Sequence, residues 1–256
     1  MAALECDFFS ETLGMLSRMR VILPEPSFER FRASGGASIP DGKFPVLFLL
    51  HGLGDNESAW TRFTSIERYI AQIGFAVVMP NVHRSFYSNM KHGYRYWDFI
   101  SEELPFKARS LFPLSSERRH TFAAGLSMGG YGALKLGLSK PESFCAVASL
   151  SGSCELKGLR DRPEELRLVF GEEANIAASG GDLIELARAL AGSDRPKPQI
   201  YQCCGTEDPL LAGNRRFSSA IEPLGYDHIY EEGPGGHDWA YWDQAIQRVI
   251  EWLPPA

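Results

Sequence analysis

Residues 125–136 read GLSMGGYGALKL, and residues 120–124, just before them, read HTFAA. The segment places Ser127 between Gly125 and Gly129 in the order Gly-x-Ser-x-Gly. A short apolar run precedes the serine and a helix-forming run follows it, which predicts a strand, a sharp turn and a helix. Such a turn is a nucleophile elbow, in which a Cβ at either glycine would collide with nearby backbone. A five-residue pattern also arises by chance, so the rest of the chain must support it.

The composition is that of one globular domain. The 256 residues are 44% hydrophobic and 23% charged, which suits a single α/β domain over residues 1–256. The net charge of -6 is spread over the chain, so no basic stripe for nucleic acid is present. No window approaches 18 uninterrupted apolar residues, and the first residues include acidic ones where a signal peptide has a basic region. We therefore expect no nucleic-acid or membrane partner and a cytoplasmic location.

The cysteines and histidines show no framework for cross-links or metal. The five cysteines are an odd number without Cys-x-x-Cys spacing, and none of the six histidines repeats at metal-ligand spacing. We expect mostly buried free thiols, no metal and no cofactor. The cysteines are Cys6, Cys145, Cys154, Cys203 and Cys204.

Apolar strand-like runs alternate with helical patterns along most of the chain. This alternation predicts the α/β class, with a mostly parallel central sheet and helices on both faces. Strands are expected at 44–52, 75–81, 120–125, 144–152, 199–205 and 226–233. Helices are expected at 65–74, 94–112, 128–139, 182–190, 214–225 and 239–253.

Local signals refine this outline. Residues 1–25 indicate short strands joined by turns, at an antiparallel edge of the sheet. Gly74, Pro105 and Asn214 are expected to close, kink and cap their respective helices. Residues 153–197 interrupt the alternation. They form an insertion that is either a cap over an active site or cover for a face of the sheet.

A nucleophilic serine needs a base and an acid, and the sequence offers both after later strands. In proteins with a Gly-x-Ser-x-Gly nucleophile elbow, the acid follows the serine in the chain and the histidine comes last. Asp208 lies in CCGTEDPLL and His237 lies in EEGPGGHDWAYW. Both would stand at the carboxyl ends of parallel strands, the edge where such sheets bind ligands. Glu207 is an alternative acid, but Asp208 has the shorter side chain and is favoured.

The same chemistry needs N–H donors for a developing oxyanion. Met128 follows the nucleophile and supplies one backbone N–H. The loop LLHGLGDN supplies the other, and Leu53 is the best candidate because glycines on both sides let the backbone bend. Aromatic and histidine side chains near the expected mouth are candidates for substrate binding. They are Trp60, His83, Tyr94 and Trp239.

Several motifs together resemble the esterase D family of α/β hydrolases, and its tributyrin esterase-like bacterial members in particular. They read LLHGLGDNESAW, VVMPN, YRYWDFISEELP, AAGLSMGGYGALKL, CGTEDPLL and GGHDWAYWD. The resemblance covers almost the whole chain. It implies a serine carboxylesterase that hydrolyses short-chain acyl esters through an acyl-enzyme on Ser127. It also implies that Asp208 and His237 complete a triad, that Leu53 and Met128 form the oxyanion hole, and that no cofactor takes part.

Other activities on the same fold stay open. S-formylglutathione hydrolases belong to the same superfamily, but they tend to carry His-Ser-Met after the first elbow glycine, where this chain has Leu126. Acyl transfer to an alcohol or sugar uses the same residues. A binding protein that keeps the fold without turnover is a third alternative. The expected partner is a small-molecule ester, and related enzymes often self-associate into homo-oligomers.

Overall fold

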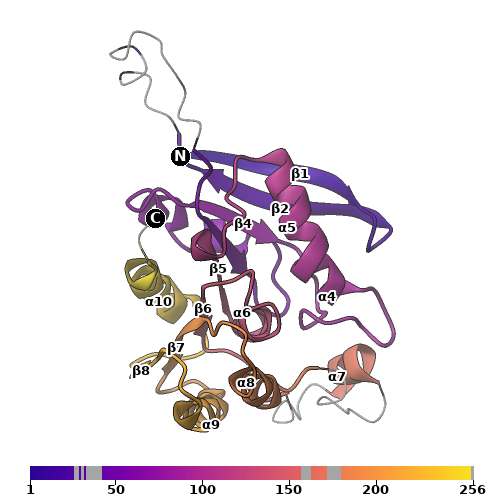
Figure 1. Ribbon diagram of the computed structural model, residues 1–256, viewed down its shortest axis with the longest axis vertical. Helices are drawn as coiled ribbons and strands as arrows, with labels where there is room; N and C mark the ends of the chain where they lie inside the picture. Colours follow the sequence, from indigo (N-terminus) through magenta and orange to yellow (C-terminus); the bar gives the residue numbers. More distant parts are fainter. Residues whose placement is uncertain (26–28, 30–31, 33–41, 157–162, 172–179, 255–256) are drawn as a thin grey trace.

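One mixed sheet organises the molecule. The computed structural model describes residues 1–25, 29, 32, 42–156, 163–171 and 180–254. Its eight-stranded sheet has the order β1-β2-β4-β3-β5-β6-β7-β8 (Figure 1). Strands β3 to β8 run parallel to one another, whereas β1 and β2 form an antiparallel hairpin joined to β4. The predicted α/β fold with an antiparallel edge is confirmed.

The strands match the apolar runs of the sequence. Those in the middle of the sheet are buried along their whole length because helices cover both faces. The strands are β1 Ala2–Ser10, β2 Met15–Leu23, β3 Val46–Leu50, β4 Ala76–Pro80, β5 Thr121–Leu126, β6 Ala146–Leu150, β7 Gln199–Gly205 and β8 His228–Gly233.

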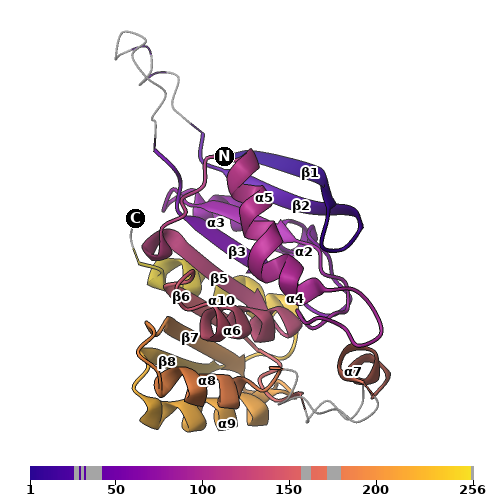
Figure 2. The same ribbon diagram turned by 45° about the vertical axis from the view of Figure 1, so that its right-hand side comes forward.

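The helices divide into two layers. One core, which contains Phe48 of β3, lies under α4, α5, α6, α8 and α9. The other, which contains Leu47 and Leu49, lies under α2, α3 and α10 (Figures 1 and 2). The helices are α2 Ala59–Phe63, α3 Ile66–Ile70, α4 Tyr96–Asp98, α5 Leu104–Leu111, α6 Met128–Ser139, α7 Pro163–Phe170, α8 Leu183–Ala191, α9 Leu211–Ile221 and α10 Trp239–Trp252. Short 3-10 turns span Arg118–His120 and Glu222–Leu224.

Two local predictions are modified by tertiary structure. The helix expected over residues 94–112 is divided, because a π-helical turn at Phe99–Glu103 separates α4 from α5. Pro105 lies at the start of α5, directly after this wider turn. Gly74 has φ +70° and ends the segment after α3, as expected, although the regular helix stops at Ile70.

The prediction that Asn214 caps a helix is wrong. Helix α9 begins three residues earlier, at Leu211, and Asn214 is buried inside it. Its side-chain amide donates to the carbonyl oxygens of Gly152 at 2.9 Å and of Leu210 at 3.0 Å. Its side-chain oxygen accepts from the Gln202 amide at 2.9 Å. The polar side chain therefore serves a buried network, which a reading of helix-end preferences does not detect.

The segment 153–197 contains two helices with different surroundings. Helix α8 packs on α6 and α9, so this part covers a face of the sheet. Helix α7 lies apart from it (Figure 2), beside the loop after β4, where the Lys91 N–H donates to the Val169 carbonyl at 2.8 Å. Residues 157–162 and 172–179 of the predicted insertion lie outside the described residues. A cap function for the α7 part stays a prediction.

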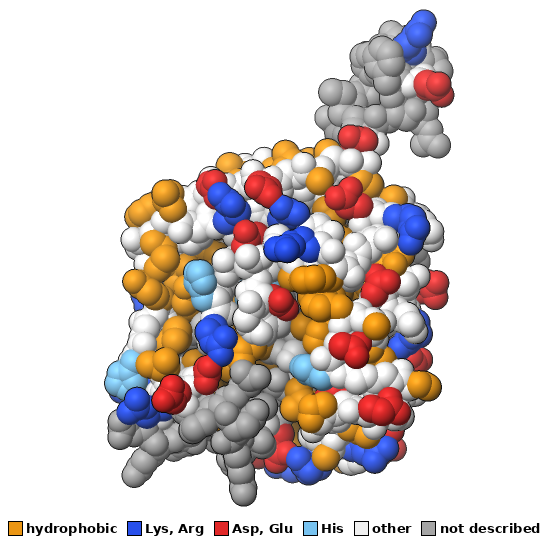
Figure 3. All heavy atoms as spheres, turned by 180° about the vertical axis from the view of Figure 1, so that it is seen from behind, with side chains coloured by type: hydrophobic (Ala, Val, Ile, Leu, Met, Phe, Trp, Pro, Cys, Tyr) orange, Lys and Arg blue, Asp and Glu red, His pale blue; other side chains and the backbone are white. Residues whose placement is uncertain are grey.

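The surface and the thiols agree with the composition. Figure 3 shows acidic and basic side chains mixed across one face of the molecule. All five cysteines are free, and four of them are buried, as expected. Within the described ranges, no helix combines the length and the apolar character needed to cross a membrane.

Candidate active site

Ser127 occupies a sharp turn between β5 and α6. Its φ of +52° and ψ of -117° are strained for a residue with a side chain. A Cβ on Gly125 would lie 2.5 Å from the Gly129 carbonyl carbon. A Cβ on Gly129 would lie 2.4 Å from the carbonyl oxygen of Leu50 and 2.7 Å from that of His51. The two glycines are therefore needed for the close backbone approach that the motif predicts.

Backbone hydrogen bonds fix the nucleophile turn to the sheet. The Ser127 N–H donates to the Leu150 carbonyl at 2.9 Å, and the Ser127 carbonyl accepts from the Ser153 N–H at 3.1 Å. Both partners lie at or after the carboxyl end of β6, the neighbouring strand. The serine is 9% exposed, so only a small part of it faces the outside.

The loops after β7 and β8 bring an acid and a base to this serine. His237 Nε2 lies 2.9 Å from Ser127 Oγ, and His237 Nδ1 lies 2.8 Å from Asp208 Oδ2. Both separations are hydrogen-bond distances. Glu207, the alternative acid, is exposed, and its carboxylate accepts from the Gly235 N–H and the Thr206 hydroxyl. The structure thus brings together the three side chains that the sequence predicted as a triad.

Asp208 is held in its ionised form. Burial raises the pKa of its carboxyl, but hydrogen bonds from His237 and from the Leu210 N–H outweigh that effect and lower the pKa below its ordinary value. The Leu210 N–H lies 2.8 Å from Oδ1 and leaves Oδ2 for the histidine. An ionised Asp208 orients the ring with Nδ1 protonated and Nε2 free to accept a proton. The imidazole ring of His237 is also held by packing, since Trp242 lies edge-on to it at 4.9 Å between centroids.

The two loops that carry the acid and the base lock onto each other. A Cβ on Gly205 would lie 2.1 Å from the Gly235 carbonyl oxygen, and the Glu207 N–H donates to that same oxygen at 3.1 Å. Asp238, next to the histidine, caps α10 by accepting from the Tyr241 N–H at 3.0 Å. Its carboxylate therefore has a local structural role at the start of the helix.

The two expected oxyanion donors border the serine. Met128 is the first residue of α6, and N–H groups in a first helical turn have no intrahelical acceptor. Leu53 lies in the loop after β3, between Gly52 and Gly54, which has φ +92°. A Cβ on Gly52 would be 3.7 Å from Ser127 Cβ, so this loop passes directly beside the nucleophile.

The substrate-binding candidates separate into two groups. In the first, the Trp239 ring stacks on Phe63 at 4.9 Å and meets Trp60 and Trp242 edge-on at 5.2 and 5.4 Å. Because Trp242 contacts His237, this aromatic cluster adjoins the base. Trp60 is only 1% exposed and donates its indole N–H to the Leu50 carbonyl at 3.0 Å, so it supports the cluster from the buried side.

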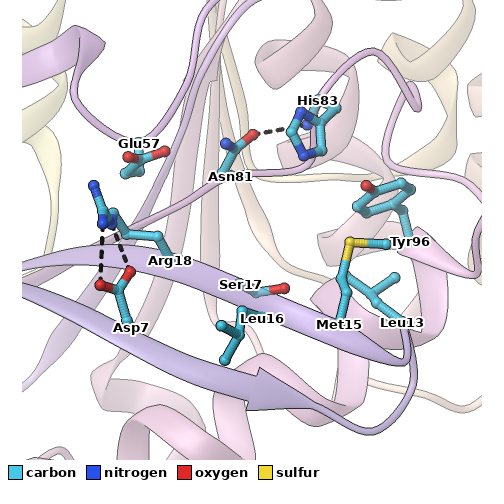
Figure 4. Close-up of a pocket in the computed structure, with 10 residues that line it drawn as sticks. All are labelled: Asp7, Leu13, Met15, Leu16, Ser17, Arg18, Glu57, Asn81, His83 and Tyr96. Carbon is cyan, nitrogen blue, oxygen red and sulfur yellow. Dashed lines mark hydrogen bonds and ion pairs between the residues drawn. The ribbon is translucent and has the colours of Figure 1, made fainter.

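The second group lies by the loop after β4. His83 and Tyr94 both meet Tyr96 edge-on, at 6.1 and 6.3 Å between centroids. His83 and Tyr96 line a cavity of about 430 Å³ between this loop and the β1-β2 hairpin (Figure 4). The cavity is lined by Asp7, Leu13, Met15, Leu16, Ser17, Arg18, Glu57, Asn81, His83 and Tyr96.

Sequence reasoning missed the hairpin side of this cavity. Met19 of β2 pairs with Pro80, the last residue of β4, so residues 15–18 continue past the carboxyl edge of the neighbouring strand. Arg18 Nε lies there 2.6 Å from Asp7 Oδ1 (Figure 4). The sequence of the hairpin predicts its strands. The number of residues by which β2 extends past β4 depends on strand register, which the sequence does not specify.

Comparisons with known proteins identify the family of this chain. The profile of the putative esterase family matches residues 10–253. An acetyl esterase of Caldicellulosiruptor saccharolyticus is 30% identical over 265 residues, which cover 99% of this chain and 98% of the relative. Two Staphylococcus aureus structures are similar over 98% of both chains. The fluorophosphonate-binding serine hydrolase FphF has 34% identity and a TM-score of 0.90, and the S-formylglutathione hydrolase FrmB has 35% identity and a TM-score of 0.87.

Proposed function

Because this chain belongs to the putative esterase family, we propose that Ser127 is the nucleophile of its reaction, His237 the base and Asp208 the carboxylate that orients the base. The chain is a serine carboxylesterase of the α/β-hydrolase fold, with esterase D-like relatives. The observation that carries the residue assignment is the continuous hydrogen-bonded series from Asp208 Oδ2 through both ring nitrogens of His237 to Ser127 Oγ.

Acylation uses each of these atoms in turn. His237 Nε2 takes the proton of Ser127 Oγ while that oxygen forms a bond to the ester carbonyl carbon. The carbonyl π electrons move to the oxygen, which becomes the oxyanion. When they return, the bond to the leaving oxygen breaks, and the imidazolium gives its proton to that oxygen, which departs as the alcohol. Water then repeats the sequence on the acyl-enzyme and releases the acid and the free serine.

The oxyanion is held by the backbone N–H groups of Met128 and Leu53. Both flank Ser127, Met128 as the next residue and Leu53 on the loop beside it. Donors fixed by the backbone need no reorganisation when the charge develops, so they stabilise the transition state more than the substrate.

The substrate is a small ester, and we assign short acyl chains to it. The Trp239 cluster, with Phe63 half exposed beside it, offers an apolar surface next to the base. Trp60 acts there by supporting Trp239. We assign His83 and Tyr94, whose rings both contact Tyr96, to the opposite side of the substrate. We infer that aromatic side chains on two sides of the ester limit the length of the acyl chain.

Steady-state and burst hydrolysis of p-nitrophenyl acetate, butyrate and octanoate test this function. We expect turnover of the two short esters, and a fall of about 10⁴-fold or more in Ser127→Ala. Ser139→Ala, at the far end of the same helix, is the matched control and should keep the wild-type rate. Near-full activity in Ser127→Ala would overturn the assignment of the nucleophile.

A thioester substrate is the second candidate, because FrmB is named an S-formylglutathione hydrolase and is similar to this chain over its full length. S-formylglutathione belongs in the same assay beside the oxygen esters. A kcat/KM for the thioester far above that for p-nitrophenyl acetate would favour this candidate and leave the three catalytic residues unchanged. Addition of alcohol acceptors, with ester product as the readout, distinguishes acyl transfer from hydrolysis.

A further inference from the structure

We propose that Tyr87 positions the loop that carries Leu53, and that Lys135 of α6 holds Tyr87 in place. The proposal rests on the proposed function, since it takes the Leu53 N–H to be an oxyanion donor. Both are positioning residues, because they act through the backbone of His51 and do not touch the reacting atoms.

The link from Tyr87 to the loop is one hydrogen bond across 36 residues of sequence. The Tyr87 hydroxyl group donates to the His51 carbonyl oxygen at 2.8 Å, and His51 comes two residues before Leu53. The tyrosine is fully buried. Burial raises its pKa well above the ordinary value, so the hydroxyl keeps its proton and remains a donor.

The ring of His51 ties the same loop to the same segment. The Val82 N–H donates to His51 Nε2 at 3.1 Å, and His51 Nδ1 lies 2.8 Å from the Gly52 carbonyl oxygen. This pattern requires a neutral ring with its proton on Nδ1. Burial lowers the pKa of His51 to about 4, which keeps the ring neutral at ordinary pH. Two contacts from residues 82–87 therefore fix the start of the oxyanion loop.

The backbone at Tyr87 is strained. Phe86 has φ +48° and Tyr87 has φ +49°, and bulky side chains rarely adopt this left-handed region. Consecutive strained residues persist only where the surroundings hold them. In this conformation the Tyr87 ring lies against Gly132 of α6.

Helix α6 holds Tyr87 at two successive positions on one face. A Cβ on Gly132 would lie 2.5 Å from Tyr87 Cγ, so the glycine makes room for the ring. One turn later, Lys135 Nζ donates to Ser88 Oγ at 2.7 Å and to the Tyr87 carbonyl at 3.3 Å. The same ammonium lies 4.6 Å from the centroid of the Trp97 ring. The lysine therefore closes the strained turn at its carbonyl end.

Lys135 is otherwise hard to explain. It is 4% exposed, and lysine is almost never so buried without an ionic partner. Among the residues that the structure describes, no carboxylate forms an ion pair with it, and burial lowers its pKa to about 7. Its hydrogen bonds to Tyr87 and Ser88 and its contact with the Trp97 ring offset the cost of this burial. A requirement for that turn accounts for its place in the helix.

A single helix thus relates the two oxyanion donors to each other. Helix α6 begins with Met128, the first donor, directly after the nucleophile. The same helix sets the second donor, Leu53, through Tyr87 and the His51 carbonyl. The spacing of the donors is then determined on one rigid element, and does not depend on a flexible loop finding its own position.

The test compares Tyr87→Phe with Tyr226→Phe. Each substitution removes a hydroxyl that donates to a backbone carbonyl at 2.8 Å, but Tyr226 donates to Ala187 of α8, away from the site. We expect both variants to lose some thermal stability. Only Tyr87→Phe should lower kcat for p-nitrophenyl acetate, by about tenfold with KM within about twofold, because loss of a whole oxyanion donor costs about 10²- to 10³-fold and here the donor is only displaced.

A transition-state analogue separates positioning from general loss of structure. An aliphatic trifluoromethyl ketone forms an oxyanion when a serine adds to it, whereas a short alcohol bound as product does not. In Tyr87→Phe the inhibition constant of the ketone should rise in parallel with the fall in kcat/KM. The inhibition constant of butanol should stay the same.

Lys135→Met supplies an independent route to the same conclusion, and it remains available if Tyr87→Phe fails to fold. We expect a smaller fall in kcat, about threefold to tenfold by the same displacement argument. The double variant should be no slower than Tyr87→Phe alone, because Lys135 acts through Tyr87. Wild-type kcat and ketone affinity in both single variants would overturn the inference. The proposed function fails separately, through activity in Ser127→Ala.

Discussion

The nucleophile and the base come from regions of the molecule that are built in opposite ways. On the nucleophile side, residues 121–138 are buried without interruption, and glycines allow backbone to touch backbone. On the base side, the edge strand β8 has no fully buried residue, and His237 stands on a loop held by hydrogen bonds. Close backbone packing inside a buried strand and helix dominates the first region. In the second, the close approach of Gly205 to Gly235 is combined with polar contacts beside an exposed edge strand.

The difference matches what each group does in catalysis. The oxygen of Ser127 must meet the carbonyl carbon at one position relative to the oxyanion donors, which favours a rigid turn. The ring of His237 must serve Ser127 first and the leaving oxygen later. A half-buried ring, tethered through Nδ1 to Asp208, can tilt between these partners without disturbing the core.

The largest expected effect breaks the steric side of the comparison. In Gly129→Ala the new Cβ would meet the carbonyl oxygens of Leu50 and His51, which cannot move without shifting β3. We expect a loss of stability at or above the ~3 kcal/mol of severe overpacking, with no measurable esterase activity. Gly233→Ala on the base side, where a Cβ meets nothing within 4 Å, is the control in urea denaturation. Equal losses of stability in Gly129→Ala and Gly233→Ala would contradict the claim that the nucleophile side is the more closely packed.

Asp208→Asn breaks the polar side while leaving the fold intact. The Asn amide can donate to His237 Nδ1 and so favours the tautomer whose Nε2 cannot accept a proton. We expect kcat for p-nitrophenyl acetate to fall about 10³- to 10⁴-fold with little change in the urea midpoint. Glu207→Gln, the neighbouring carboxylate, should lose less than about tenfold. The reverse order would mean that Glu207 is the acid.

A pH series of unfolding experiments sharpens the comparison on the nucleophile side. The pKa of Lys135 is about 7 in the folded protein, below its ordinary value of 10.5. Between these values the unfolded chain binds a proton that the folded chain releases, so this residue makes stability rise with pH, by at most about 1.4 kcal/mol per pH unit. In Lys135→Met that part of the slope should disappear. Identical slopes for wild type and variant at pH 7–9 would contradict a buried lysine.

The smallest expected effect concerns the exposed surface of the base side. Arg215 and Glu232 form an ion pair at 2.6 Å, and the arginine side chain is 59% exposed. Solvent and salt screen such pairs, so Arg215→Ala should cost less than about 1 kcal/mol and leave kcat unchanged. A larger loss of stability, measured by thermal unfolding at low and high salt, would show that β8 depends on this pair.

Much of the site could be predicted because its signals are local. The turn at Ser127 needs glycines at fixed spacing, and the acid and base follow buried strands in an order set by the fold. The α/β class and the resemblance to esterase D-like enzymes are confirmed on this basis. The catalytic, oxyanion and substrate-binding roles stay predictions, although the structure brings Ser127, Asp208 and His237 together and places Leu53 and Met128 beside the serine.

What could not be predicted depends on contacts between distant segments. The bond from Tyr87 to His51 joins a side chain to a carbonyl 36 residues away, and such a pair leaves no periodic pattern. Asparagine is a preferred residue at helix N-caps, but the Asn214 amide forms its hydrogen bonds inside the core. The cavity beside His83 depends on how far β2 extends past β4, which is a matter of strand register.

The glycine-lined face of α6 also limits how this enzyme can change over generations of mutation. At Gly129 and Gly132 the smallest side chain would meet neighbouring atoms at 2.4 and 2.5 Å, so almost every substitution in this helix face is expected to be eliminated. Directed-evolution libraries spread evenly over the site would lose most of their members there. Diversity concentrated around β8, the Trp239 cluster and the β1-β2 hairpin should yield folded variants in which new ester preferences can be selected.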